Sequence, residues 1–315
     1  MKVTLSSLVR TLAVGAGAFL LPVALLAGEQ GHYLPNSWSP RDLISAPAGL
    51  LVVAPYASFY DADRARTGSG EKVDASTGID VGASSWAFTP VLVYAPSAKP
   101  FGAEWTVTVV PAFGEAGANA RLTAFGYDIT LFDNNNRGVG DLYVVPANLT
   151  WHLGPTWALS AQYSFWAPVG EYDAGRADNV GLGYWSHDFR GTVSYFPLGN
   201  PGLLLSASVV HEINGRKEGF DLRPAPHTTA ELGASIAFSE KLMCGVMAGA
   251  IWETGDATGE DAAEDGRDRM VNVSVEATYW FVPGKLGTMA RVTREFEARD
   301  RFEGTLLTVG LNYLF

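Results

Sequence analysis

The sequence predicts an all-β protein, a single antiparallel transmembrane β-barrel of about twelve strands with short periplasmic turns and long extracellular loops. Three observations predict it: segments that alternate in polarity, connections that alternate in length, and an unusual composition. Charged residues make up 17% of the 315 residues, aromatic residues make up 12%, and there are 35 glycines. Ordinary soluble domains carry about 25% charged residues. Mean hydropathy is +0.08, which is too polar for a bundle of transmembrane helices.

The charge balance narrows the function classes. The formal net charge is −11 and the isoelectric point is about 4.9. Nucleic-acid-binding proteins carry basic surfaces, so we expect no nucleic-acid partner. Cys244 is the only cysteine, so no disulfide can form within the chain.

The N-terminus resembles a secretory signal. Lys2 and Arg10 provide positive charge, and the apolar stretch 11–26 is too short for a typical membrane-spanning helix. Small residues follow, so we expect residues 1–27 to be a signal peptide that is cleaved after export across the inner membrane. An uncleaved anchor helix is the alternative.

Residues 28–47 precede the first expected strand and show no clear period. They are rich in proline, serine and aromatic residues. We expect this N-terminal segment either to hang in the periplasm or to enter the lumen as a partial plug. Tyr33 and Trp38 give it apolar surface to bury, which favours insertion.

Polarity alternates with a period of two along segments of about 10–13 residues, the length of a tilted transmembrane strand. In 271–281, valines, Ala277, Tyr279 and Phe281 share one face, and Asn272, Ser274, Glu276 and Thr278 share the other. The barrel is expected to occupy 48–315. The twelve expected strands are 48–60, 79–95, 103–114, 139–151, 156–168, 182–196, 202–214, 227–238, 241–253, 270–282, 285–297 and 303–315.

The connections between these strands run 18, 7, 24, 4, 13, 5, 12, 2, 16, 2 and 5 residues. A transmembrane barrel sorts its connections in this way, with short periplasmic turns and long outer loops. Aromatic residues near the strand ends fit the girdles of such a barrel. Segment 120–132 looks strand-like, but a thirteenth strand would break the parity, so we place it in the second outer loop.

The last strand ends on an aromatic residue. Leu307, Val309, Leu311, Tyr313 and Phe315 share one face, which we expect to meet lipid. A terminal strand ending in phenylalanine resembles the signal that outer-membrane barrels present to the bacterial barrel-assembly machinery. Tyr313 and Phe315 would carry this signal.

The polar face should line the lumen. If Pro283 and Gly284 form a two-residue turn, Val282 pairs with Lys285, and Glu276 then faces Arg291. An Arg or Lys facing lipid at mid-membrane costs about 2–4 kcal/mol, so we expect an inward ion pair that serves mainly as part of the wall. The other expected lumen charges are Glu104, Asp188, Arg190, Glu231 and Glu295.

Catalysis, metal and cofactor binding are not expected. None of the five histidines lies in a G-x-S-x-G or H-E-x-x-H context. A long-range pair, such as His211 with a serine, would make a barrel enzyme that acts on lipid. The acids of loop 255–268 are oxygen ligands of the kind that suit calcium, but they lack an ordered spacing and read better as a solvated loop. A structural barrel with a closed lumen is the third alternative.

Two prolines interrupt expected strands. Proline cannot donate to a β-ladder, so Pro90 and Pro146 mark positions where ladder bonds fail. A lateral gap at one of them would give apolar solutes a route through the wall. Unbroken pairing on both sides of both prolines would argue against it.

Several stretches resemble a family of bacterial outer-membrane proteins linked to the meta-pathway of phenol degradation. They are GHYLP (31–35), APAGL (46–50), GVGDLYVVPANLTW (138–151), APVGEYDAGRADNVGLGYW (167–185) and DRFEGTLLTVGLNYLF (300–315). The resemblance implies an outer-membrane barrel, in contact with outer-membrane lipid, that passively takes up small hydrophobic or aromatic solutes. It implies no catalytic residue and no substrate-specific one.

Overall fold

The computed structural model describes residues 31–315 except 63, 74–78, 125–126, 177 and 263–266. The expected signal peptide, residues 1–27, lies outside the described residues. Within the described part, no helix has the length and apolar character needed to cross a membrane. Two short 3₁₀ turns, η2 (Pro100–Gly102) and η3 (Pro197–Gly199), lie in connections between strands.

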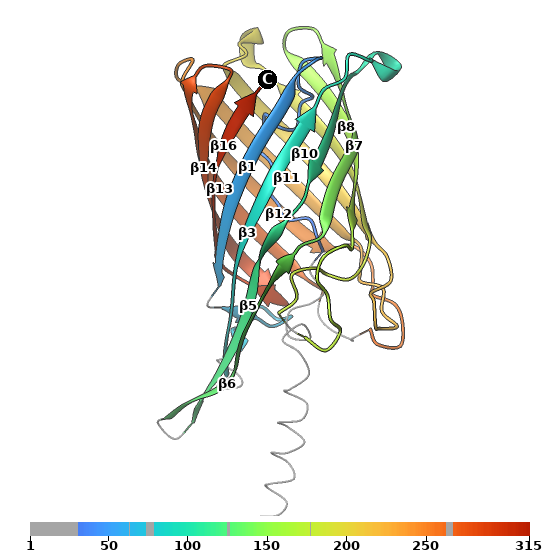
Figure 1. The fold of residues 1–315 in the computed structure, drawn as a ribbon, viewed down its shortest axis with the longest axis vertical. Coiled ribbons are helices and arrows are strands. Elements are labelled where there is room, and N and C mark those ends of the chain that lie inside the picture. Colours follow the sequence, from blue (N-terminus) through green and yellow to red (C-terminus); the bar gives the residue numbers. More distant parts are fainter. Residues whose placement is uncertain (1–30, 63, 74–78, 125–126, 177, 263–266) are drawn as a thin grey trace, which may run out of the picture.

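The chain folds into a closed antiparallel β-barrel (Figure 1). The main sheet has 14 strands and closes because β1 pairs with both β16 and β3. Two of them, β5 and β6, form a hairpin outside the closed ring, which leaves twelve. The ring strands are β1 (Leu51–Ala62), β3 (Ile79–Tyr94), β4 (Glu104–Val110), β7 (Leu142–Leu153), β8 (Trp157–Ala167), β9 (Ser186–Tyr195), β10 (Leu203–Asn214), β11 (His227–Ala237), β12 (Leu242–Glu253), β13 (Arg269–Val282), β14 (Leu286–Arg299) and β16 (Thr305–Leu314).

This architecture confirms the expected fold class, and each ring strand overlaps one of the twelve expected segments. The expected pairing of Val282 with Lys285 is wrong. Lys285 belongs to the turn, where its N–H bonds the carbonyl of Val282, and Val282 pairs with Leu286. A register shift between Trp280 and Val282 absorbs the extra residue, so Glu276 still faces Arg291.

Assigning residues 115–138 wholly to a loop is also wrong. β5 (Phe113–Ala124) pairs with β3 and with β6 (Tyr127–Val139), and the hairpin projects past the long-loop end of the barrel (Figure 1). β5 continues the direction of β4 after Pro111, so β3 changes partner from β4 to β5 along its length. The ring keeps an even number of strands because β5 and β6 both lie outside it.

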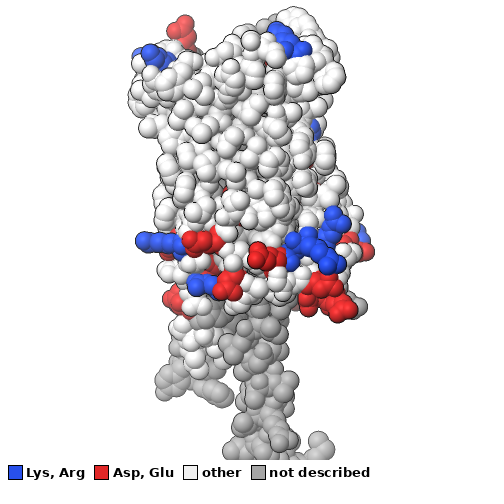
Figure 2. Space-filling view, turned by 45° about the vertical axis from the view of Figure 1, so that its right-hand side comes forward, with Lys and Arg blue, Asp and Glu red and all other residues white. Residues whose placement is uncertain are grey.

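The two faces of the wall differ in polarity. On β13, Val271, Val273 and Val275 are exposed outward, while Asn272 and Ser274 are buried inward. The outer surface is almost free of charge between the two rims, and charged side chains gather mainly towards the long-loop end (Figure 2). An apolar outer wall around a polar interior is the arrangement of a membrane-spanning barrel.

The ends of the barrel carry different structures. The short connections, including 154–156, 238–241 and 283–285, lie at one end, and the long ones lie at the other. At the long-loop end, β2 (Ala65–Arg66) pairs with β15 (Arg301–Phe302). At the short-turn end the C-terminal strand completes the seam, where the N–H of Phe315 bonds the carbonyl of Leu51 at 2.9 Å. The assembly role of Tyr313 and Phe315 stays a prediction.

Candidate functional site: the lumen and its N-terminal segment

The seven charged residues assigned to the lumen all lie on the inward side of their strands. Six are buried, namely Asp188, Arg190, Glu231, Glu276, Arg291 and Glu295. Glu104 is more open, at the short-turn mouth, where its carboxylate lies 3.1 Å from Nε2 of His152. Alternation fixes these directions, because a charge on the other face would meet lipid.

Residues 31–47 run inside the barrel and bond these inward side chains. Near the long-loop end, the backbone N–H groups of His32 and Tyr33 donate to the two oxygens of Glu212, at 3.0 and 2.8 Å. The N–H of Asn36 and the hydroxyl of Tyr33 both donate to Glu231, at 2.6 and 2.7 Å. A carboxylate can accept several hydrogen bonds at once, so each glutamate holds two groups of the segment.

Tyr33 is the most deeply enclosed aromatic residue of the segment, with 2% of its surface exposed. Its ring stacks under Arg190, whose guanidinium carbon lies 4.9 Å from the ring centroid, and Arg190 also donates to the Tyr33 hydroxyl. Burial raises the pKa of Tyr33 well above its ordinary value. The hydroxyl therefore stays protonated and available as a donor to Glu231.

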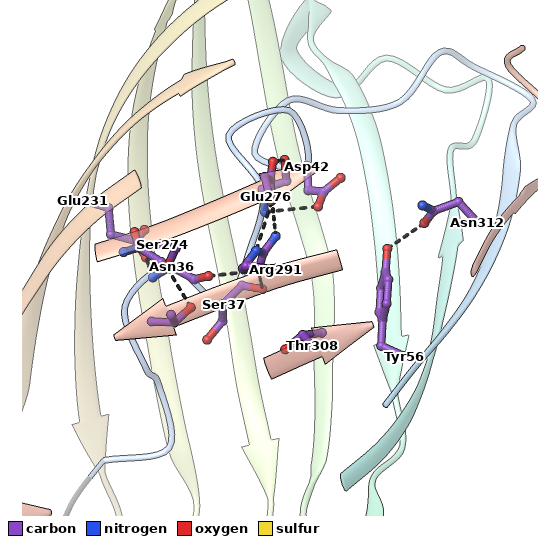
Figure 3. A network of polar contacts seen from close by, with 12 residues as sticks. Asn36, Ser37, Asp42, Tyr56, Glu231, Ser274, Glu276, Arg291, Thr308 and Asn312 are labelled. Carbon is purple, nitrogen blue, oxygen red and sulfur yellow. Dashed lines mark hydrogen bonds and ion pairs between the residues drawn. The ribbon is translucent and has the colours of Figure 1, made fainter. Parts of the chain in front are cut away.

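Arg291 joins the wall to the segment (Figure 3). Its Nε and Nη2 donate to one oxygen of Glu276, at 3.0 and 2.8 Å, across the β13–β14 pair. Its Nη1 donates to the carbonyls of Asn36 and Ser37, at 2.9 and 2.7 Å. The ion pair thus lies where the sequence placed it, but one of the three guanidinium nitrogens binds the segment.

Further contacts follow the segment to the short-turn end. Ser45 bonds Thr150 and the carbonyl of Asn148, at 2.8 and 2.9 Å, and the N–H of Ala46 bonds Thr106 at 3.1 Å. These partners belong to β4 and β7. The segment therefore crosses the lumen from one end to the other before β1 begins.

Asp141 ties the start of the segment to the outer loop 168–185. One of its oxygens lies 2.9 Å from Nε2 of His32 and accepts the N–H of Leu182 at 2.8 Å. The other accepts the N–H of Gly170 at 3.0 Å. Burial lowers the pKa of His32, and the carboxylate of Asp141 acts in the opposite direction. No local pattern indicates this junction, because its parts are far apart along the chain.

Replacing Asp141 with asparagine is expected to destabilise this junction. Hydrogen bonds to a charged acceptor contribute about 1.5–3 kcal/mol each and neutral ones about 0.5–1.5, so three weakened bonds should cost about 2–4 kcal/mol. Limited proteolysis at Arg176 in loop 168–185 would report the loss as faster cleavage. Asp178→Asn, which breaks only the pair with Arg176, is the control; equal cleavage of both variants would contradict the role of Asp141.

A serine–histidine contact is present, but in the lumen rather than at the lipid face. Ser186 Oγ lies 2.7 Å from Nδ1 of His32 and donates to Asn214 at 2.6 Å. Ser186 is fully buried, so a lipid cannot reach its hydroxyl. His211, the histidine considered for a hydrolase, contacts Thr228 instead of a serine. Among the described residues, no cluster of three or more acidic, histidine or cysteine side chains could hold a metal ion.

The wall is interrupted at both prolines. Pro90 pairs in register with Pro55 of β1, but on its other side β3 stops pairing with β5 at Phe88 and resumes with β4 only at Leu92. At Pro146 the register shifts against both β4 and β8. The indole N–H of Trp105 covers the Pro146 carbonyl at 3.0 Å. A lateral gap at these positions stays a prediction.

A closed twelve-stranded barrel with an apolar outer wall and a polar, occupied lumen defines a β-barrel of the outer-membrane class. The chain belongs to the family described as "Putative MetA-pathway of phenol degradation", whose model matches residues 62–310. No curated protein matches the sequence.

The fold is similar to that of an outer membrane channel from Pseudomonas putida F1. That structure is 18% identical, has a TM-score of 0.70, and is matched over 89% of this chain and 100% of its own. The translocator domain of the autotransporter NalP from Neisseria meningitidis is 12% identical over 87% of this chain and 91% of its own, with a TM-score of 0.47. At these identities the first likeness supports the fold alone, and the second adds no argument.

Proposed function

We propose that the protein is a channel of the bacterial outer membrane that passively admits small hydrophobic or aromatic compounds, with residues 31–47 as a plug. The observation that carries the proposal is that the lumen is lined by polar side chains bonded to this separate segment. A purely structural barrel would fill its interior with side chains of the wall. Membership of a family named for phenol degradation supports an aromatic solute.

Polar and apolar solutes would take different routes past the plug. A polar solute would need the plug to move, because Glu212, Glu231 and Arg291 hold the plug across the lumen. An apolar solute would instead leave the lumen through the wall, at the interruption between β3 and β4 beside Pro90. We infer that apolar compounds use the wall and that the plug limits leakage of polar ones.

Conductance of the mature protein in a planar bilayer tests this proposal. We expect the wild-type channel to conduct weakly, and phenol to change the current by binding within the barrel. The protein should raise entry of an apolar fluorescent phenol into liposomes several-fold over the protein-free rate, and should raise entry of a sugar of similar size much less. Entry of both solutes at their own protein-free rates would remove the transport proposal and favour a structural barrel.

The alternative that the protein is a barrel enzyme acting on lipid has a separate test. If the buried contact between His32 and Ser186 were catalytic, the protein would hydrolyse phospholipid or an ester substrate, and Ser186→Ala would abolish the activity. We expect the wild type and this variant to be equally inactive. Hydrolysis by the wild type alone would replace the channel proposal.

A further inference from the structure

Arginines face outward at the long-loop end of β13 and β14. Arg269 is the first residue of β13 and shares the exposed face of that strand with Val271 and Val273, whereas Met270 is buried. Directly opposite Arg269 on β14 is Arg299. Like charges directly opposed on a strand pair repel each other, so this arrangement needs a compensating anion.

Two carboxylates of the same rim are already engaged by other arginines. Asp268 pairs with Arg301 at 3.0 Å, and Glu303 pairs with Arg66 at 3.0 Å. Within the described ranges, neither the side chain of Arg269 nor that of Arg299 has a hydrogen-bond or ion-pair partner, and neither does the side chain of the exposed Glu297 on β14. Glu297 offsets only one of these two positive charges, so a net positive charge remains on this part of the outer wall of an acidic protein.

The depth of Arg269 matches a membrane boundary. Tyr279 lies ten residues further along the same outward face of β13, at the short-turn end. At about 3.3 Å per residue and a tilt of about 40°, ten residues span about 25 Å along the membrane normal, which is the height of the apolar band. With Tyr279 at one interface, Arg269 lies at the other, where lipid phosphates are found.

A third arginine lies deeper on the same wall. Arg294 of β14 is opposite Val273, four residues in from Arg269, and its Nη1 donates to Thr305 at 2.7 Å. It is partly exposed on the outward face. A long side chain can reach towards the interface from this depth, which brings its charge nearer to Arg269.

The outer wall is hollowed beside these arginines. A shallow apolar groove of about 580 Å³ crosses β9 to β13 and ends at Val271, the next outward residue after Arg269. The groove is concave because small residues line it, namely Gly191, Ala207, Ala230, Ala248 and Ala250. An apolar chain lying there would place a phosphate at its end beside the arginines.

We propose that Arg269, Arg299 and Arg294 bind the phosphate of a phosphorylated glycolipid of the outer leaflet, with one acyl chain in the groove. A guanidinium forms two parallel hydrogen bonds to a phosphate, and the anion removes the repulsion between Arg269 and Arg299. The assignment of this end to the outer leaflet rests on the proposed channel orientation. The site itself does not depend on transport.

Native mass spectrometry of the full mature protein in detergent would test the site, with diphosphoryl lipid A as the probe. Arg269→Gln combined with Arg299→Gln should weaken lipid A binding at least tenfold, and lysine at both positions should weaken it less. The matched control is Arg137→Gln with Arg216→Gln, which removes two exposed charges elsewhere, one on β6 and one in the loop between β10 and β11. Unchanged binding in the Arg269 and Arg299 double variant would overturn the proposal.

Two further measurements distinguish binding of a lipid from binding of a free anion. Ala248→Phe fills the groove and should weaken lipid A binding several-fold, whereas Ala290→Phe, outward on β14 away from the groove, should not. Millimolar inorganic phosphate should fail to displace the lipid. Displacement by phosphate, with no effect of Ala248→Phe, would show a simple anion site and would overturn the lipid assignment. Heat-modified migration on gels checks that each variant is folded.

Discussion

Deleting residues 31–44 from the mature chain is expected to raise single-channel conductance by at least about tenfold, because a twelve-stranded ring without its plug encloses an aqueous lumen. The open pore should favour cations. Within the ring strands, two buried arginines, Arg190 and Arg291, would line it against five buried carboxylates, which are Asp188, Glu212, Glu231, Glu276 and Glu295. Reversal potentials in a salt gradient measure the selectivity directly.

A milder variant guards against failure of the deletion to assemble. Tyr33→Ala with Asn36→Ala keeps the chain length but loses the bond from the Tyr33 hydroxyl to Glu231 and the bond from the Asn36 side chain to Asn272. It should give frequent openings of the same size as the deletion. Ser37→Ala is the control, because the Ser37 hydroxyl bonds only Leu34 within the segment. Wild-type conductance in both the deletion and the double variant would mean that the segment does not block the lumen.

Arg291→Ala is expected to lower the free energy of unfolding by about 3–5 kcal/mol, the largest effect of any single substitution considered. Removing one partner of a buried ion pair leaves the other charge uncompensated. Here Glu276 would lose both of its bonds to Arg291, and the carbonyls of Asn36 and Ser37 would lose theirs. Urea unfolding in lipid vesicles, followed by tryptophan fluorescence, measures the loss.

Two comparisons separate the charge from the geometry. Arg291→Lys keeps the charge but cannot form the planar fork, so we expect an intermediate loss. Arg137→Ala breaks an exposed pair with Glu115 and should change stability by no more than about 0.5 kcal/mol. If Arg291→Ala were as mild as Arg137→Ala, the ion pair would not hold the plug to the wall.

The barrel was predictable because its pattern is repeated. Each strand meets lipid on one side and water or polar groups on the other, so twelve alternating segments and sorted connections give the same answer independently. The inward direction of Glu276 and Arg291 follows from the same alternation. Glu212 could have been found in this way too, since it shares the inner face of 202–214 with Ser206 and Ser208.

The plug contacts and the β5–β6 hairpin were less accessible to such reasoning. Residues 31–47 have no period, so nothing local indicates that Asn36 bonds Asn272, 236 residues away. In 113–139, parity in the ring forbids one extra strand but permits two. The predicted pairing of Lys285 was wrong for a different reason. A three-residue turn with a compensating bulge gives the same pairing of Glu276 with Arg291 as a two-residue turn does.

The plug is held by side chains of many separate strands. Among its described residues, 31–47, no backbone β-pairing attaches it to the wall. Its contacts with Glu212, Glu231, Arg291 and Thr150 are spaced along the barrel axis. Mechanically, such a segment can be withdrawn stepwise, one anchor at a time, while the wall keeps every backbone bond. The end joined to Leu51 is fixed to the wall. With the signal peptide cleaved as expected, release would begin at the long-loop end and travel towards the periplasm.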